Sequence, residues 1–213
     1  GADRVAVARV DEAIQLRQAG IRAPILLIAG YVPAETASIV QYRITPTVVS
    51  VGQALLLART ADEHGQVVSV HVKVDTGLTR FGANPAQVPA LVRLLRSLPS
   101  LQLEGLYSHF AAADDEDRAF TEDQLHRLYA VVEAVERSEG DGWRPPLVHA
   151  ANSAAALREP TAWLHMVRIG IALSGHYPSE HVTRSVRLKP AVALRSRVLA
   201  VREIAAGTSV GYS

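Results

Sequence analysis

The chain has 213 residues, of which 48% are hydrophobic and 20% are charged, and its net charge is +1. This composition excludes intrinsic disorder, and the lack of a basic excess argues against nucleic-acid binding. No cysteine is present, which excludes disulfides and thiolate sites, and no apolar run reaches the roughly 18 residues that a membrane span needs. We therefore expect a soluble, cytoplasmic globular protein without nucleic-acid or membrane partners.

Strand-like and helix-like segments alternate along the chain. Short apolar runs predict seven strands, at 4–9, 24–29, 47–50, 67–75, 103–109, 146–151 and 166–173. Helix signals lie between these runs: Asp11, Pro33, Gly52, the N-cap pair Asn84-Pro85, and a capping box at 121–124 that opens a helix closed by Gly140.

Alternation of this kind is typical of a parallel α/β sheet. A Rossmann-type sheet would carry Gly-x-Gly-x-x-Gly after an early strand, and none is present, so a (β/α)8 barrel that lacks its first strand is favoured. From Leu188 the pattern changes, and alternation over 191–201 and 207–213 predicts a strand pair. We expect a barrel domain at 1–185 and the beginning of a C-terminal β domain at 186–213.

The segment 67–75 has the clearest two-faced pattern. Its even positions from 68 to 74 are all valine, whereas its odd positions are Ser69, His71, Lys73 and Asp75. Side chains of a strand alternate between its faces, so in a barrel the valines would pack on helices and the polar row would face the lumen. An antiparallel strand with one solvent-exposed face would show the same pattern.

Two candidate site residues lie at or just after the carboxyl ends of predicted strands. Arg80 lies between Gly77 and Gly82 in the loop after 67–75, where a guanidinium suits a carboxylate or phenolate oxygen. His109 ends the strand 103–109, a position typical of an active-site residue in a barrel. The plainer interpretations are a solvated loop arginine and a packed structural histidine. The acidic loop 114–117 fits a solvated surface better than a metal site, so no metal is expected.

The last two predicted strands are each followed by small residues. Segments 149–153 and 168–171 contain Asn, Ser and Gly, which let backbone N–H groups approach an anion. Loops after strands seven and eight of a barrel commonly bind phosphate. Arg168 could add charge there or meet a ring nitrogen, or it could merely form an ion pair at a helix end.

Several of these segments match one family in order and type. Residues 71–82 contain Lys73, Asp75, Thr76, Gly77, Arg80 and Gly82 at the spacing K-x-D-T-G-x-x-R-x-G, and so resemble the signature of alanine racemases. Further segments that resemble this family are 107–114, 151–153, 166–171, 188–191 and 209–213. The resemblance covers essentially the whole chain.

The resemblance implies a pyridoxal-phosphate (PLP) enzyme that acts as a homodimer and interconverts L- and D-alanine, which bacteria use in cell-wall peptide synthesis. It implies that Ser153, Gly170 and Ile171 hold the cofactor phosphate, and that Arg168 meets the pyridine nitrogen with His109 beside it. Arg80 would contact the phenolic oxygen and the substrate carboxylate, and Lys73 would support Arg80, as a carbamate in several members. A guanidinium at the ring nitrogen makes the ring a weak electron sink, which suits racemisation by two bases.

The sequence departs from the family in two catalytic positions. The family's cofactor-linking lysine lies in a motif like K-A-N-A-Y-G-H-G, and this chain has only Lys73 and Lys189. Tyr212 lies upstream of the motif that carries the family's catalytic tyrosine. We therefore expect no catalytic base in these 213 residues and no activity of the chain alone. A PLP racemase of another amino acid, a barrel-type decarboxylase and a non-catalytic PLP-binding or dimerisation module are the alternatives.

Overall fold

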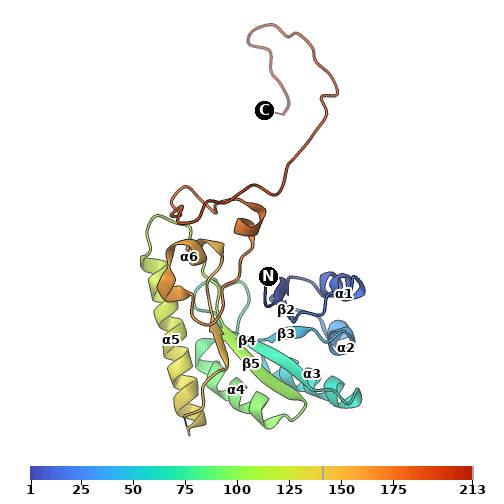
Figure 1. Cartoon of the computed structure of the whole chain (residues 1–213), viewed down its shortest axis with the longest axis vertical. Helices are drawn as coiled ribbons and strands as arrows, with labels where there is room; N and C mark the ends of the chain where they lie inside the picture. The colour runs from blue at the N-terminus through green and yellow to red at the C-terminus, as the bar shows by residue number, and fades with distance from the viewer. Residues whose placement is uncertain (141, 213) are drawn as a thin grey trace.

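The structure is a computed structural model that describes residues 1–140 and 142–212 (Figure 1). Six parallel strands form one sheet in chain order: β1 (Val5–Val7), β2 (Ile25–Leu27), β3 (Thr45–Val48), β4 (Val68–Lys73), β5 (Leu101–Tyr107) and β6 (Leu147–His149). Each strand pairs with the next one along the chain, and the sheet curls into part of a barrel. The predicted barrel-type α/β fold is confirmed.

The helices α1 (Val10–Gln18), α2 (Thr36–Gln41), α3 (Val51–Glu63), α4 (Val88–Ser97) and α5 (Ala119–Glu139) connect successive strands, and α6 (Ser153–Arg158) follows β6. 3-10 turns lie at Pro33–Glu35, Pro85–Gln87, Pro160–Ala162 and Ile171–Ser174. The Asn84 cap is confirmed, since its Oδ1 accepts a hydrogen bond from Ala86 N at 3.0 Å. The prediction that a capping box at 121–124 opens this helix is wrong, because α5 already begins at Ala119. There Asp117 Oδ1 accepts a hydrogen bond from Ala119 N at 2.9 Å.

The two faces of the sheet differ in chemistry. Apolar side chains of one face join the helices in the main core, and Val68, Val70, Val72 and Val74 all belong to it. The other face carries the buried polar residues of alternate positions, among them Thr47, His71, Lys73, Tyr107 and His149. The predicted sorting of 67–75 into an apolar and a polar row is therefore confirmed.

The seventh strand, expected at 166–173, is not formed. Arg168 N donates to Ala151 O at 2.9 Å, but the next amides of Gly170 and Ala172 donate to Ser153 Oγ instead of to a strand. The chain then turns into the 3-10 segment Ile171–Ser174. No strand follows β6 in the part of the chain that the structure describes.

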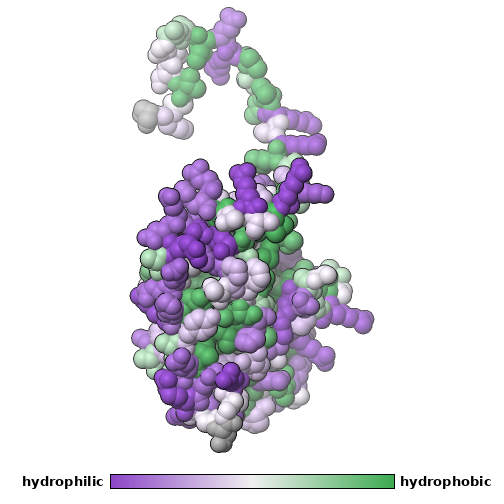
Figure 2. Space-filling view, turned by 60° about the vertical axis from the view of Figure 1, so that its left-hand side comes forward, coloured by the Kyte–Doolittle hydropathy of each residue, from purple (hydrophilic) through white to green (hydrophobic). Residues whose placement is uncertain are grey.

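The strands expected at 191–201 and 207–213 are also absent from the described residues, and Ser213 lies outside these residues. Ala191 N donates to Ser174 O at 3.0 Å, and beyond it the chain leaves the body as an extended segment (Figure 1). Its apolar side chains are open to solvent, as Figure 2 shows, and Leu194 is 100% exposed. A strand pair needs a sheet or core to bury its apolar face, and these residues contact none. The domain boundary at 185/186 stays a prediction. No helix within the described ranges is long and apolar enough to cross a membrane.

Candidate active site

The carboxyl ends of β4, β5 and β6 bring together most of the residues that the sequence singled out. Lys73 ends β4 and His109 follows β5 by two residues. Arg168 lies after α6 and contacts His149, the last residue of β6, and Ser108, the residue directly after β5. Carboxyl ends of parallel strands meet at one rim of a barrel, which is where barrel enzymes carry their active sites.

Arg168 is the most firmly held of these side chains. Its Nη1 donates to His149 Nδ1 at 2.6 Å, and its Nη2 donates to Ser108 O at 2.8 Å and to Ala150 O at 2.9 Å. Nη2 also lies 3.2 Å from His109 Nδ1. A guanidinium has five N–H groups, so at least the Nε–H and one Nη1–H have no acceptor among the described residues. Burial lowers the pKa of Arg168 to about 10, which leaves it charged at neutral pH.

Two further titratable groups beside Arg168 are shifted by burial and by positive charge. Burial, followed by the charges of Arg80 and Arg168, lowers the pKa of Lys73 to about 8. Burial, followed by the charges of Arg168, Lys73 and Arg80, lowers the pKa of His109 to about 4. Lys73 makes no ion pair with any described residue, and its Nζ lies 5.5 Å from the ring centroid of Phe81. The rim is therefore a cationic site that suits an anionic ligand.

Asp75 fixes the base of the loop that carries Arg80. Its Oδ1 accepts from Gly77 N and Thr79 N, each at 3.0 Å. At the other end of the loop, a Cβ on Gly82 would lie 2.7 Å from Asp75 N, so only glycine allows this approach. Arg80 itself is exposed and makes no hydrogen bond with the described residues. Its guanidinium is thus free to meet a ligand.

Ser153 and Gly170 lie together, as the phosphate prediction requires. Ser153 Oγ accepts from Gly170 N at 2.9 Å and from Ala172 N at 3.3 Å. A Cβ at Gly170 would meet nothing within 4 Å, so this backbone is open to an approaching group. Ile171 is half exposed beside it. The structure brings these three residues to one place, and phosphate binding there stays a prediction.

Buried polar residues behind the rim were not predicted as site residues. The Tyr107 ring stacks on the His149 ring with centroids 4.6 Å apart and 6° between their planes, and its hydroxyl lies 2.7 Å from Thr47 Oγ1. His149 Nε2 in turn lies 3.0 Å from His71 Nδ1. The signal in the sequence was the presence of polar residues at inward positions of otherwise apolar strands.

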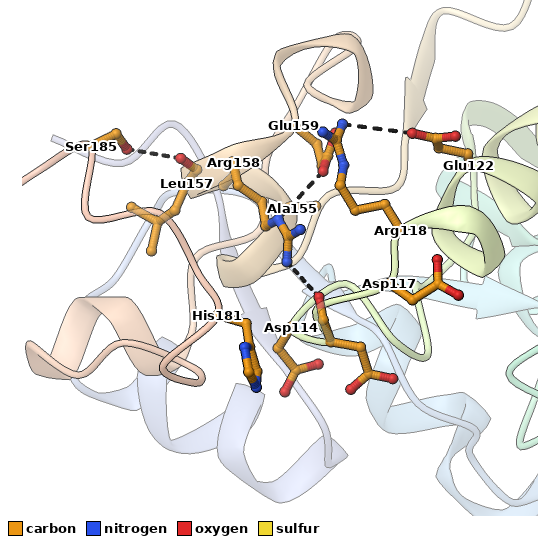
Figure 3. A network of polar contacts seen from close by, with 12 residues as sticks. Asp114, Asp117, Arg118, Glu122, Ala155, Leu157, Arg158, Glu159, His181 and Ser185 are labelled. Carbon is orange, nitrogen blue, oxygen red and sulfur yellow. Dashed lines mark hydrogen bonds and ion pairs between the residues drawn. The ribbon is translucent and has the colours of Figure 1, made fainter.

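The acidic loop after His109 is tied to the segments that follow β6 (Figure 3). Arg158 Nη1 donates to Asp115 O at 2.6 Å, and Ser179 Oγ donates to Asp114 O. The buried Glu159 pairs with Arg118 and lies 3.5 Å from Arg158. These contacts hold the loop in place near the rim. The described residues contain no group of three or more His, Asp or Glu arranged to hold a metal.

Comparison with known proteins identifies the family. The model of the alanine racemase N-terminal domain matches residues 1–178. The chain belongs to the alanine racemase family. Among its relatives are the alanine racemases of Nostoc sp. and Desulfovibrio desulfuricans, which are 40% and 41% identical over 100% of this chain and 55% and 56% of their own length. The chain therefore spans about half the length of these racemases.

Solved alanine racemases share this fold. The enzyme of Clostridium difficile in complex with cycloserine superposes with a TM-score of 0.85 and 35% identity, covering 89% of this chain and 52% of that one. The enzyme of E. faecalis gives a TM-score of 0.79 at 34% identity, over 89% of this chain and 50% of its own. Family and fold are those that the motifs at 71–82 and 107–114 predicted.

Proposed function

We propose that this chain is the cofactor-binding part of a PLP-dependent alanine racemase, an isomerase that interconverts L- and D-alanine. The observation that carries the proposal is the gathering of Lys73, Arg80, His109 and Arg168 at the strand ends of an alanine racemase barrel. By the same family membership we propose that the complete protein is cytoplasmic and forms a homodimer. Sedimentation of the complete protein would test the dimer.

The residues at the rim fit pyridoxal phosphate. The cofactor carries a dianionic phosphate and a phenolate, and its amino-acid substrate carries a carboxylate, whereas the rim carries three cationic side chains without an ion-pair partner among the described residues. We assign Ser153, Gly170 and Ile171 to the phosphate, since no side chain covers Gly170 and since Ser153 Oγ, which accepts from Gly170 N, still has its own O–H to donate. Hydroxyls and backbone N–H groups are common phosphate donors.

Arg168 is assigned to the pyridine nitrogen, with His109 beside it. A guanidinium keeps its proton at any physiological pH and only donates hydrogen bonds. When bound, the cofactor supplies an electron sink for negative charge at the substrate α-carbon. Because the Arg168 guanidinium does not transfer a proton to the pyridine nitrogen, this sink stays weak. This favours brief removal and return of one proton, as in racemisation, over decarboxylation.

Arg80 and Lys73 are assigned to the anionic oxygens. Arg80 has no hydrogen-bond partner among the described residues and lies on a loop whose base Asp75 fixes, which supports its assignment to the phenolic oxygen and the substrate carboxylate. Burial, and after it the charges of the nearby Arg80 and Arg168, lower the pKa of Lys73 to about 8. A larger neutral fraction favours reaction with carbon dioxide, and a carbamate at Lys73 would turn repulsion of Arg80 into attraction.

The test is racemisation by the complete protein. We expect PLP-dependent interconversion of L- and D-alanine that Arg80→Ala and Arg168→Ala reduce by at least ~100-fold, because each removes charge-assisted hydrogen bonds to the bound groups. Arg59→Ala is the matched control, since Arg59 pairs only with Glu63 on the surface of α3 and should leave activity unchanged. Full activity of Arg168→Ala would contradict the assignment.

A further inference from the structure

A continuous chain of hydrogen bonds runs from Arg168 through the inside of the half-barrel to Glu104. Arg168 Nη1 lies 2.6 Å from His149 Nδ1, and His149 Nε2 lies 3.0 Å from His71 Nδ1. His71 Nε2 lies 3.3 Å from Glu104 Oε2, and Arg4 Nη2 donates to Glu104 Oε1 at 2.7 Å. Both imidazole rings are fully buried, so water cannot replace a missing partner.

The chemistry of its two ends sets the direction of every bond in this chain. A guanidinium only donates, so His149 Nδ1 is the acceptor and the proton of that ring lies on Nε2. The Nε2–H then donates to His71 Nδ1, which places the proton of His71 on its own Nε2. That proton needs an acceptor, and the carboxylate of Glu104 is an acceptor that cannot donate.

The charge states agree with this direction. Burial lowers the pKa of both His71 and His149, so each ring is neutral at pH 7 and carries a single N–H. The hydrogen bond from His71, aided by Arg4, holds the pKa of Glu104 at about 2, so it is ionised. One donor and one acceptor on each ring satisfy both nitrogen atoms.

The backbone of β5 is shaped to place Glu104 in this chain. The β4–β5 register shifts between Val70 and His71, so Leu103 lies opposite Val70 and Gly105 opposite His71. The extra residue at this bulge is Glu104. A Cβ at Gly105 would lie 2.5 Å from the His71 ring, so glycine is needed for the ring to occupy its position.

We propose that Glu104 is a positioning residue that, through His71 and His149, sets the proton pattern holding the Arg168 guanidinium at the rim. Without an acceptor at position 104, His71 Nε2–H is left buried without a partner. Moving the proton to His71 Nδ1 forces that of His149 onto Nδ1, where it faces an N–H of Arg168. Arg168 then loses its 2.6 Å bond and its fixed orientation. Of this proposal, only the expected effect of Glu104 on racemisation rests on the proposed function.

The test is the side-chain tautomer of each ring, measured by long-range proton–nitrogen NMR on the complete, cofactor-free protein. In the wild type we expect both His71 and His149 to be neutral with the proton on Nε2 at pH 7. Glu104→Gln retains an acceptor oxygen and should keep this pattern, whereas Glu104→Leu should shift His149 to the Nδ1–H form. Glu63→Gln removes a carboxylate from the exposed pair with Arg59 and is the matched control.

Two results would overturn the proposal. One is a wild-type His149 that is protonated on Nδ1 or on both nitrogens, a result that decides the question even if Glu104→Leu does not fold. The other is a folded Glu104→Leu protein that retains both Nε2–H tautomers.

A second readout separates this proposal from the proposed function. In the cofactor-loaded protein, kcat for alanine racemisation should fall ~10-fold or more in Glu104→Leu with KM little changed, and Glu104→Gln should restore most of it. If the wild type does not racemise alanine but shows the predicted tautomers, the proposed function fails and the positioning role of Glu104 stands.

Discussion

Gly105 lies directly opposite His71 in the β4–β5 ladder, and a Cβ at position 105 would come within 2.5 Å of the His71 ring. The ring has nowhere to move, because it is buried and each of its nitrogens has a hydrogen-bond partner. The bulge, the glycine and the two buried histidines therefore form one structural unit beneath the candidate site.

Gly105→Ala should destabilise the protein by about 1–3 kcal/mol, the usual effect of overpacking a buried position. Denaturant unfolding of the complete protein measures this change. Gly52→Ala is the matched control, because Gly52 lies in α3, where a Cβ would meet nothing within 4 Å. It should be neutral or slightly stabilising. Equal stability of the two variants would contradict the packing described for His71.

Arg80→Ala and Arg168→Ala should differ in stability, although we expect both to reduce activity. Arg80 is exposed and has no hydrogen-bond partner among the described residues, so its loss should leave the free energy of unfolding within about 0.5 kcal/mol. Loss of Arg168 deprives Ser108 O, Ala150 O and His149 Nδ1 of a donor, which should destabilise the protein by about 2 kcal/mol or more. Thermal melts of both variants test this, and a reversed order would be inconsistent with the geometry of Arg168.

Acid should weaken the folded state through His109. Burial and the charge of Arg168 lower its folded pKa to about 4 from an ordinary value of 6.5, so the unfolded chain takes up the proton first as pH falls. The stability that this residue contributes is complete above pH 6.5, declines below it and is lost by about pH 4, at most about 3 kcal/mol in all.

Unfolding of the complete protein between pH 4 and 7 measures this contribution. His109→Gln should flatten the curve in this range, whereas His126→Gln, which changes an exposed residue of α5, should not. An unchanged curve for His109→Gln would show that His109 is not held neutral by Arg168 and burial.

The alternation of apolar residues and the sequence motifs predicted the parts of this protein that depend on local sequence. The valine row at 68–74 sorted the two faces of β4, and the topology of a parallel barrel brought Lys73, His109 and Arg168 to one rim. The segment 166–173 has the composition of a strand, but tertiary contacts to Ser153 Oγ take up its amides. No local pattern reveals that competition.

Long-range partners explain the other differences. Glu104 stands out as a charge in an apolar strand, yet its role depends on a bulge and on Arg4, which is 100 residues away. The alternation in 191–201 predicted a strand, but a strand forms only against a partner, and these side chains contact none.

The 213-residue chain on its own should not racemise alanine, even when supplied with PLP. Racemisation needs an amine to hold the cofactor aldehyde, and the chain has only two lysines, Lys73 and Lys189. Lys73 lies in the strand among Arg80, Arg168 and Phe81, and Lys189 is exposed at the start of the extended segment. A coupled assay for D-alanine should give no signal above the cofactor alone. Turnover by this chain, with the cofactor found linked to Lys73 after borohydride reduction, would contradict this expectation.

A crystal structure of the complete protein with pyridoxal phosphate bound tests the proposed cofactor site most directly. We expect the phosphate to lie within hydrogen-bond distance of Ser153 Oγ and the backbone of Gly170 and Ile171. We also expect that the pyridine nitrogen accepts from Arg168 and that Arg168 remains bonded to His149 Nδ1, in agreement with the proposed site. A phosphate bound elsewhere, or a ring nitrogen facing a carboxylate with Arg168 turned away, would contradict it.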